Sequence, residues 1–96
     1  MVRKYRLSAR AAAGLAKIWR EFALENVNAA DDLYIRIMEK VKSASEYPAM
    51  SSMRPDIASD VRMLIEGNYN IYYVQKRDGI LVTAIVHAKR LPANWL

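Results

Sequence analysis

The chain has 96 residues, 53% of them hydrophobic, so it can bury a core and we expect one folded domain over residues 1–96. It contains no cysteine, which excludes disulfides and thiolate metal sites. Its net charge of +5 is explained by an acidic protein partner, by nucleic acid or by solubility alone. The start resembles no signal peptide and no apolar run reaches about 20 residues, so we expect a cytoplasmic protein that does not cross a membrane.

The first half of the chain predicts a strand followed by two helices. Residues 1–7, MVRKYRL, alternate as a short edge strand does, with lysine and arginine discouraging unwanted pairing. Ser8 is the expected N-cap of a helix that ends near Asn26, and Asn28 is the expected cap of the next. Helices joined by about two residues form an antiparallel hairpin. Their apolar stripes are Ala11, Leu15, Ile18, Trp19 and Phe22, then Tyr34, Ile37, Met38, Val41 and Ala44 or Ser45.

The second half predicts three strands. Residues 45–60 contain two prolines and four serines and indicate a loop with extended pieces. Strands are expected at 61–66, 69–77 and 80–88, joined by turns at Gly67-Asn68 and Asp78-Gly79. The predicted fold class is therefore α+β, in the order β-α-α-β-β-β, with an antiparallel twisted sheet and an N-terminal α-helical hairpin packed on one face.

Two-residue turns would place Arg62, Tyr73 and Ala84 opposite one another, so that Arg62 and His87 point to different faces of the sheet. One predicted face holds Leu64, Tyr69, Ile71 and Val86, and the other holds Met63, Ile65, Tyr72, Val74, Thr83, Ile85 and His87. A two-helix hairpin can cover one face only, so the second should expose large apolar groups. We expect a partner chain, a second copy or a ligand to cover it.

Few residues could carry chemistry, and none suggests a cofactor or a metal ion. His87 is the one side chain suited to proton transfer near neutral pH, although a hydrogen-bonded structural role is favoured. Arg62 could bind a phosphate or a partner's carboxylate through its planar fork, or lie at a sheet edge with its head in water.

Aromatic residues and the end of the chain could contact another molecule. Tyr69, Tyr72 and Tyr73 could stack on bases or anchor an interface, with at least one on each face of the sheet. Residues Lys89, Arg90 and Trp95 could contact nucleic acid or protein, or belong to a frayed terminus.

Several segments together resemble the ParE toxins of the RelE/ParE superfamily. "YRLSARAAAGLAKIW" is similar to the family's first strand and helix, "YPAMSSMRPDIASDVRMLIEGNYNIYYV" to its central stretch with Arg62, and "VHAKR" to its last strand. Ser51 and Ser52 stand where the family often has glycine and a basic residue, and Leu91 stands where it often has aspartate.

The resemblance implies a toxin of a type II toxin–antitoxin system that inhibits DNA gyrase and arrests growth, and that is not an enzyme. It implies a ParD-like antitoxin in a heterotetramer or larger complex, with operator DNA bound only through that antitoxin. The surface expected for the antitoxin comprises Arg54, Arg62, Tyr69, Tyr72, Tyr73 and His87, and Lys89, Arg90 and Trp95 are candidates for contact with the target.

The alternative within the superfamily is a RelE-like, ribosome-dependent messenger RNA endoribonuclease. Its catalytic candidates would be Arg62 and His87. The loop from Glu46 to Asp60 contains no lysine and only Arg54, which is few groups for metal-free cleavage of RNA. The sequence therefore favours gyrase inhibition.

Overall fold

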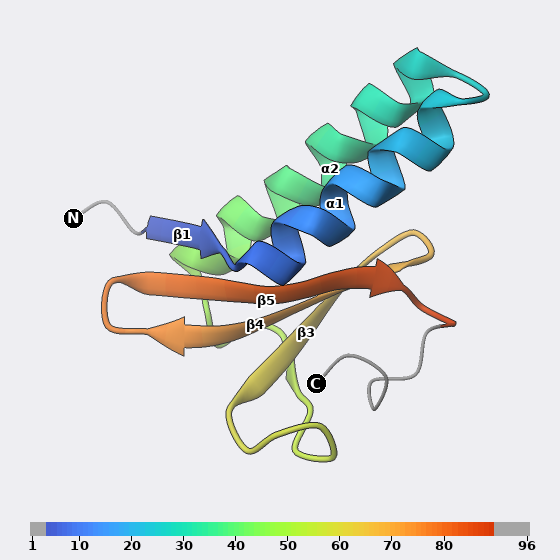
Figure 1. Cartoon of the computed structure of the whole chain (residues 1–96). Helices are drawn as coiled ribbons and strands as arrows, with labels where there is room; N and C mark the ends of the chain where they lie inside the picture. The colour runs from blue at the N-terminus through green and yellow to red at the C-terminus, as the bar shows by residue number, and fades with distance from the viewer. Residues whose placement is uncertain (1–3, 90–96) are drawn as a thin grey trace.

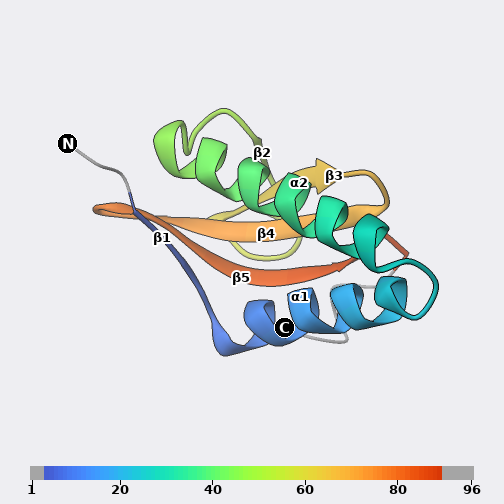
Figure 2. The ribbon, with the colours of Figure 1, turned by 90° about the horizontal axis from the view of Figure 1, so that it is seen from above.

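A computed structural model describes residues 4–89 of the chain (Figure 1). The elements are β1 (Lys4–Leu7), α1 (Ala9–Ala23), α2 (Val27–Glu46), β2 (Ser52–Met53), β3 (Val61–Glu66), β4 (Tyr69–Lys76) and β5 (Gly79–His87). The five strands form one sheet in the order β1-β5-β4-β3-β2. The α1–α2 hairpin packs on one face of that sheet, which gives two layers (Figure 2). The predicted α+β class is confirmed.

The sheet differs from the prediction in two ways. β1 pairs with β5 in parallel, so the sheet is mixed rather than antiparallel. The segment expected to be a loop supplies a fifth strand, β2, which pairs with β3. Gly79 allows the parallel contact, because its φ is 158° and a Cβ there would lie 1.7 Å from the carbonyl oxygen of Lys4. A residue with a side chain would therefore keep β1 from reaching β5.

Side-chain caps set the start of each helix. The Ser8 hydroxyl accepts a hydrogen bond from the backbone N–H of Ala11, as predicted. The second cap is Asn26 rather than Asn28: its side chain accepts from the N–H of Ala29 at 3.0 Å. α1 consequently ends at Ala23 and three residues connect the helices.

The larger core lies between the hairpin and the sheet, and it uses most of the predicted stripes. Leu33 is buried where the prediction had Tyr34, which is 44% exposed. Trp19 and Phe22 are only partly covered. The buried members of this core are Ala11, Leu15, Ile18, Leu33, Ile37, Val41, Ala44, Leu64, Ile71, Tyr73, Ile80, Val82 and Ile85.

The register is as predicted between β3 and β4, where Arg62 lies opposite Tyr73, but not between β4 and β5. The last turn occupies Arg77 and Asp78, and a bulge at Thr83 adds one residue to β5. The bulge reverses the alternation after Thr83. His87 therefore lies opposite Tyr69 on the helix side of the sheet, so the prediction that Arg62 and His87 point to different faces was wrong.

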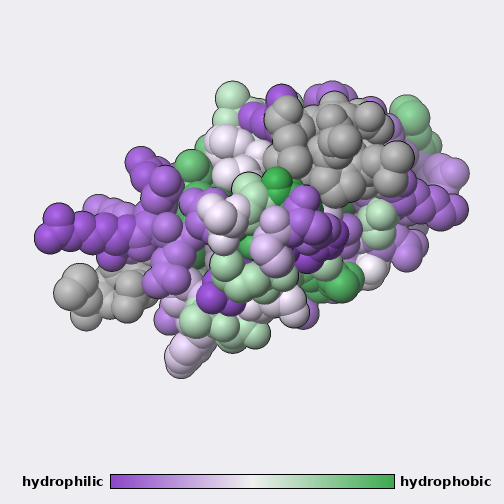
Figure 3. Space-filling model, turned by 90° about the horizontal axis from the view of Figure 1, so that it is seen from below, coloured by the Kyte–Doolittle hydropathy of each residue, from purple (hydrophilic) through white to green (hydrophobic). Residues whose placement is uncertain are grey.

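The second face of the sheet is mostly covered, contrary to the prediction. It has its own cluster of buried residues: Val61, Tyr72, Val74, Ala84 and Val86. Ile57 and Ala58, from the segment between β2 and β3, pack against this cluster. Figure 3 views this face and shows separated green patches rather than a continuous apolar surface, although Ile65 remains 56% exposed.

Candidate functional site

A groove of about 520 Å³ lies between α1 and the C-terminal end of β5. The helix approaches the strand closely because Gly14 has no side chain: a Cβ there would lie 2.4 Å from the carbonyl oxygen of Ile85. Ile18 and Ile85 form the apolar floor. The remaining lining residues are Arg10, Ala13, Lys17, Glu21, Tyr69, Val86 and His87.

Aromatic side chains form one end of the groove. The ring of Tyr69 meets those of Phe22 and His87 edge-on, at centroid distances of 6.3 and 5.4 Å. His87 Nδ1 accepts a hydrogen bond from the backbone N–H of Lys89, so the neutral ring carries its proton on Nε2. Burial raises the pKa of Tyr69, and the charge of Glu21 raises it further. The phenol is therefore kept neutral and able to donate a hydrogen bond.

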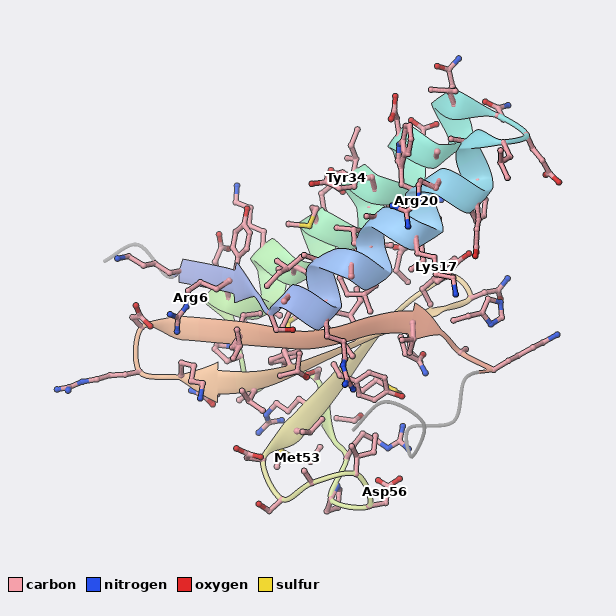
Figure 4. The ribbon with its side chains drawn as sticks, in the orientation of Figure 1. Arg6, Lys17, Arg20, Tyr34, Met53 and Asp56 are labelled. Atoms are coloured by element: carbon pink, nitrogen blue, oxygen red, sulfur yellow. The ribbon has the colours of Figure 1, made fainter. Side chains whose placement is uncertain are left out.

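Two cations, Arg10 and Lys17, lie on the side of α1 that borders the groove, two helical turns apart. Figure 4 shows Lys17 directed from α1 toward the end of β5. Both residues are exposed, and the ion pairs found within residues 4–89 involve neither of them. Glu21 is the one carboxylate of the groove. An apolar floor with a basic rim suits an amphipathic segment that carries acidic side chains.

Arg62 and Tyr73 hold the chain that follows α2. The buried hydroxyl of Tyr73 donates to the carbonyl oxygen of Pro48 at 2.7 Å and shares a second hydrogen bond with the hydroxyl of Ser51. Arg62 Nη1 donates to the carbonyl oxygen of Ser51 at 2.6 Å. Both side chains are thus engaged in fastening residues 48–51 to the sheet.

Tyr72 and Arg54 also have partners within the fold. Tyr72 is 2% exposed, and its hydroxyl accepts from the side-chain amide of Asn70 at 3.2 Å. Arg54 donates two hydrogen bonds to Asp56, at 3.0 and 2.7 Å, which hold the pKa of that carboxyl below its ordinary value. Neither side chain is presented to solvent as a free contact group.

The six residues predicted to bind a partner therefore separate into two groups. Tyr69 and His87 come together at the groove. The other four, Arg54, Arg62, Tyr72 and Tyr73, are engaged in contacts within the fold. Of the predicted target contacts, Lys89 is exposed, while Arg90 and Trp95 lie outside the described residues.

Sequence reasoning missed a second hollow, of about 480 Å³, on the outer side of the hairpin. Ala16, Trp19 and Arg20 of α1 line it with Asp31 and Tyr34 of α2. The indole N–H of Trp19 donates to Asp31 Oδ1 at 2.9 Å and so links the helices. Figure 4 shows Arg20 and Tyr34 on this outer side. The sequence did contain one sign of this hollow. Trp19 and Tyr34 each come one position after a core residue, so each side chain points about 100° away from the core around its helix.

Among residues 4–89, no three histidine or carboxylate side chains cluster as metal ligands would. None of the helices in this part of the chain is long and apolar enough to span a bilayer.

Comparison with known proteins identifies the chain. Residues 5–92 match the family described as the ParE toxin of type II toxin-antitoxin system, parDE. No curated protein gives a match. Among solved structures, the fold is similar to a chain of the chromosomal ParDE TA system from P. aeruginosa, with a TM-score of 0.76 and 21% sequence identity. That alignment covers 90% of this chain and 96% of the other. The predicted resemblance is thereby confirmed, and the chain belongs to the ParE toxin family of type II toxin–antitoxin systems.

Proposed function

We propose that this ParE-family toxin inhibits DNA gyrase and blocks replication, and that a ParD-like antitoxin neutralises it in a cytoplasmic complex, a heterotetramer or larger. The observation that carries the choice of gyrase over RNA cleavage is the placement of Arg62 and His87. Arg62 lies opposite Tyr73 and His87 opposite Tyr69, on the two sides of β4. Sheet geometry separates their Cα atoms by about 16 Å.

RNA cleavage without a metal ion requires a base for the 2′-OH and an acid for the leaving group within hydrogen-bond reach of one phosphate. The guanidinium of Arg62 instead donates to the main chain at Ser51. His87 borders the groove with Arg10, Lys17 and Tyr69, so Arg62 and His87 do not meet at one phosphate. The arrangement therefore favours a toxin that acts by binding a protein target.

The outer hollow of the hairpin is the surface that we assign to gyrase. Trp19, Arg20 and Tyr34 belong to the three residue types that dominate the energetic centres of protein interfaces. Leu24, Val27 and Ile35 are further large hydrophobic residues exposed on the same hairpin. A second candidate contact is the basic end of the chain at Lys89, Arg90 and Trp95.

The antitoxin is assigned to the groove between α1 and β5. The solved relative is described as a ParDE system, and the groove of the present chain combines an apolar floor with Arg10 and Lys17 at its rim. We expect an amphipathic acidic segment of the antitoxin to lie there, with a carboxylate close to Lys17. Sequence-specific recognition of the operator would remain with the antitoxin.

A gyrase supercoiling assay, run beside messenger RNA cleavage on translating ribosomes, tests the target. The toxin should trap cleaved plasmid, the antitoxin should relieve this effect, and ribosome-bound RNA should stay intact. His87→Ala and Arg62→Ala proteins that remain folded should keep most of the inhibition. Codon-phased RNA cuts with normal supercoiling, or loss of toxicity in a folded His87→Ala protein, would contradict the proposal.

A pair of tyrosine variants tests the gyrase surface. Tyr34→Ala should require at least about tenfold more protein for the same inhibition, because truncation of an interface anchor commonly costs more than about 1.4 kcal/mol. Tyr5→Ala is the matched control, since Tyr5 is 41% exposed but lies on β1. Equal potency of the two variants would remove the hairpin from the target interface.

The antitoxin groove is tested by charge reversal. Lys17→Glu should weaken antitoxin binding by about tenfold or more, with the larger effect at low salt, because it places a negative charge beside an acidic segment. Lys40→Glu changes the net charge equally on an exposed position of α2 outside the groove. Titration calorimetry that finds the same loss in both variants would place the antitoxin elsewhere.

A further inference from the structure

A basic corner, defined as Lys4, Arg6, Lys76 and Arg77, lies where β1 meets the turn between β4 and β5. Lys4 is paired with Gly79, and Gly79 is paired with Lys76, so one row across three strands carries two lysines. Neighbouring strands are about 4.8 Å apart, which places the two lysine Cα atoms about 10 Å from each other. The corner is the hydrophilic end of the molecule that projects in Figure 3.

Three of these cations share the face of the sheet that is turned away from the helices. In the next row across the strands, Arg6 lies opposite Leu81 and Leu81 lies opposite Val74. Leu81 and Val74 both belong to the apolar cluster on that face. Lys4 and Lys76 each lie two residues from this row, so strand alternation places them on the same side. Leu7, which follows Arg6, packs into the core on the helix side, as the alternation requires.

The positive charge of this corner is not neutralised within the described chain. All four residues are exposed, and the ion pairs found within residues 4–89 lie elsewhere, at Arg36–Glu66 and Arg54–Asp56. Asp78 is the one acidic residue of the turn. Four cations and one carboxylate give a net charge of +3, more than half of the +5 of the whole chain.

Protection of a sheet edge accounts for only part of this charge. Lysine and arginine on an edge strand discourage pairing with other chains, which explains Lys4 and Arg6 on β1. β4 is an inner strand, however, and Lys76 and Arg77 lie at its end and in the following turn. Their charge therefore needs another explanation.

The surroundings favour nucleic acid over protein or membrane as the ligand. A protein interface needs an apolar centre, and a surface helix or loop that enters a membrane needs apolar side chains to insert. None of the large hydrophobic residues exposed within residues 4–89 lies between Val74 and Leu81, and Tyr5 on β1 faces the helix side. Closely spaced cations without an apolar centre are typical of contacts with phosphates.

We propose that the basic corner binds the phosphate backbone of duplex DNA. Such contacts position a protein on DNA but do not read its bases, so the choice of operator stays with the antitoxin. The contact would hold the toxin beside the DNA on which gyrase acts. It requires neither gyrase nor the antitoxin for binding, so its failure and the failure of the gyrase proposal can be distinguished.

Fluorescence anisotropy of the purified toxin with a labelled duplex of arbitrary sequence tests the proposal. Affinity should fall between about 50 and 200 mM salt, with a log–log slope of about −0.9 for each phosphate contacted. Lys76→Ala/Arg77→Ala should weaken binding to all duplexes and make the slope shallower by about 1.8. Both residues are exposed beside a turn, and circular dichroism verifies the fold of the variant.

The matched control is Lys40→Ala/Lys42→Ala, which removes the same charge from exposed positions of α2. This control should keep the slope of the unaltered protein. Absence of salt-dependent binding to DNA, equal slopes for the two double variants, or binding of A-form RNA without binding of DNA would each overturn the proposal.

Discussion

Replacement of Gly14 by alanine should destabilise the toxin, although alanine is the better helix former. An ideal Cβ at this position lies 2.4 Å from the carbonyl oxygen of Ile85, where real Cβ contacts essentially never fall below 3.0 Å. The two backbones must therefore separate by at least 0.6 Å. The oxygen cannot move easily, because Ile85 is paired with Ile71 in the sheet. Overpacking of this kind lowers the free energy of unfolding by about 1–3 kcal/mol, and the higher helix propensity of alanine offsets about 1 kcal/mol of that loss. We expect a net loss of up to about 2 kcal/mol.

Denaturant and thermal unfolding measure this loss. A domain of this size loses about 4–8 °C in Tm for each kcal/mol, so the Gly14→Ala midpoint should fall by up to about 16 °C. Ala12→Gly, at an exposed position of the same helix, measures helix propensity alone and should cost about 1 kcal/mol. If Gly14→Ala instead stabilised the protein by about 1 kcal/mol, as at an exposed helical glycine, the close contact of α1 with β5 would be refuted.

Two tyrosines provide further predictions. Tyr73→Phe should lower the free energy of unfolding by about 1–3 kcal/mol and speed hydrogen exchange in residues 48–51, because the carbonyl of Pro48 loses its buried donor. The control Tyr5→Phe, at an exposed site, should change the free energy of unfolding by less than about 0.5 kcal/mol. The raised pKa of Tyr69 adds stability that is fully present below the unfolded pKa near 10 and is lost as the pH rises through the folded value. Urea unfolding at rising alkaline pH should therefore show a smaller loss of stability for Tyr69→Phe than for the unaltered protein, and equal losses would contradict this reasoning.

The sequence predicted the features that depend on local chemistry. Ser8 caps α1, the turn at Gly67-Asn68 joins β3 to β4, and the register of these two strands follows from it. The Asp78-Gly79 turn was wrong by one residue because Gly79 is needed inside β5, where Lys4 approaches it. That requirement comes from a strand more than 70 residues away, which local turn preferences cannot reveal.

The candidate site was only partly predictable, because the bulge at Thr83 is also set by distant contacts. The carbonyl oxygen of Thr83 accepts a hydrogen bond from the Ser8 hydroxyl at 3.1 Å, and its Oγ1 donates to the carbonyl oxygen of Tyr72 at 3.3 Å. The bulge brings His87 to the same side as Tyr69 and so creates the groove. The alternation of residues along β5 gives no sign of the bulge, because both faces of this strand are apolar.

Coverage of the second face also escaped prediction. Ile57 and Ala58 stand in a segment with the composition of a loop, yet they pack against the buried cluster of the second face. A short segment can form such a lid only because β2 and Arg54 fix its ends to β3. The composition of the strands correctly indicated that both faces needed a cover, but not that the chain supplies much of the second cover itself.

The place of β5 in the sheet governs when the toxin can fold during its synthesis. β1 has β5 as its neighbour in the sheet, and α1 packs on the same strand. The first elements to leave the ribosome therefore cannot form their native contacts until the last strand has been synthesised. The hydrogen bond from Ser8 to Thr83 spans 75 residues. Contacts this remote in sequence slow folding and leave a nascent chain without a complete core. Fragments that end before β5 should therefore be unfolded, because they lack the strand on which both β1 and α1 pack.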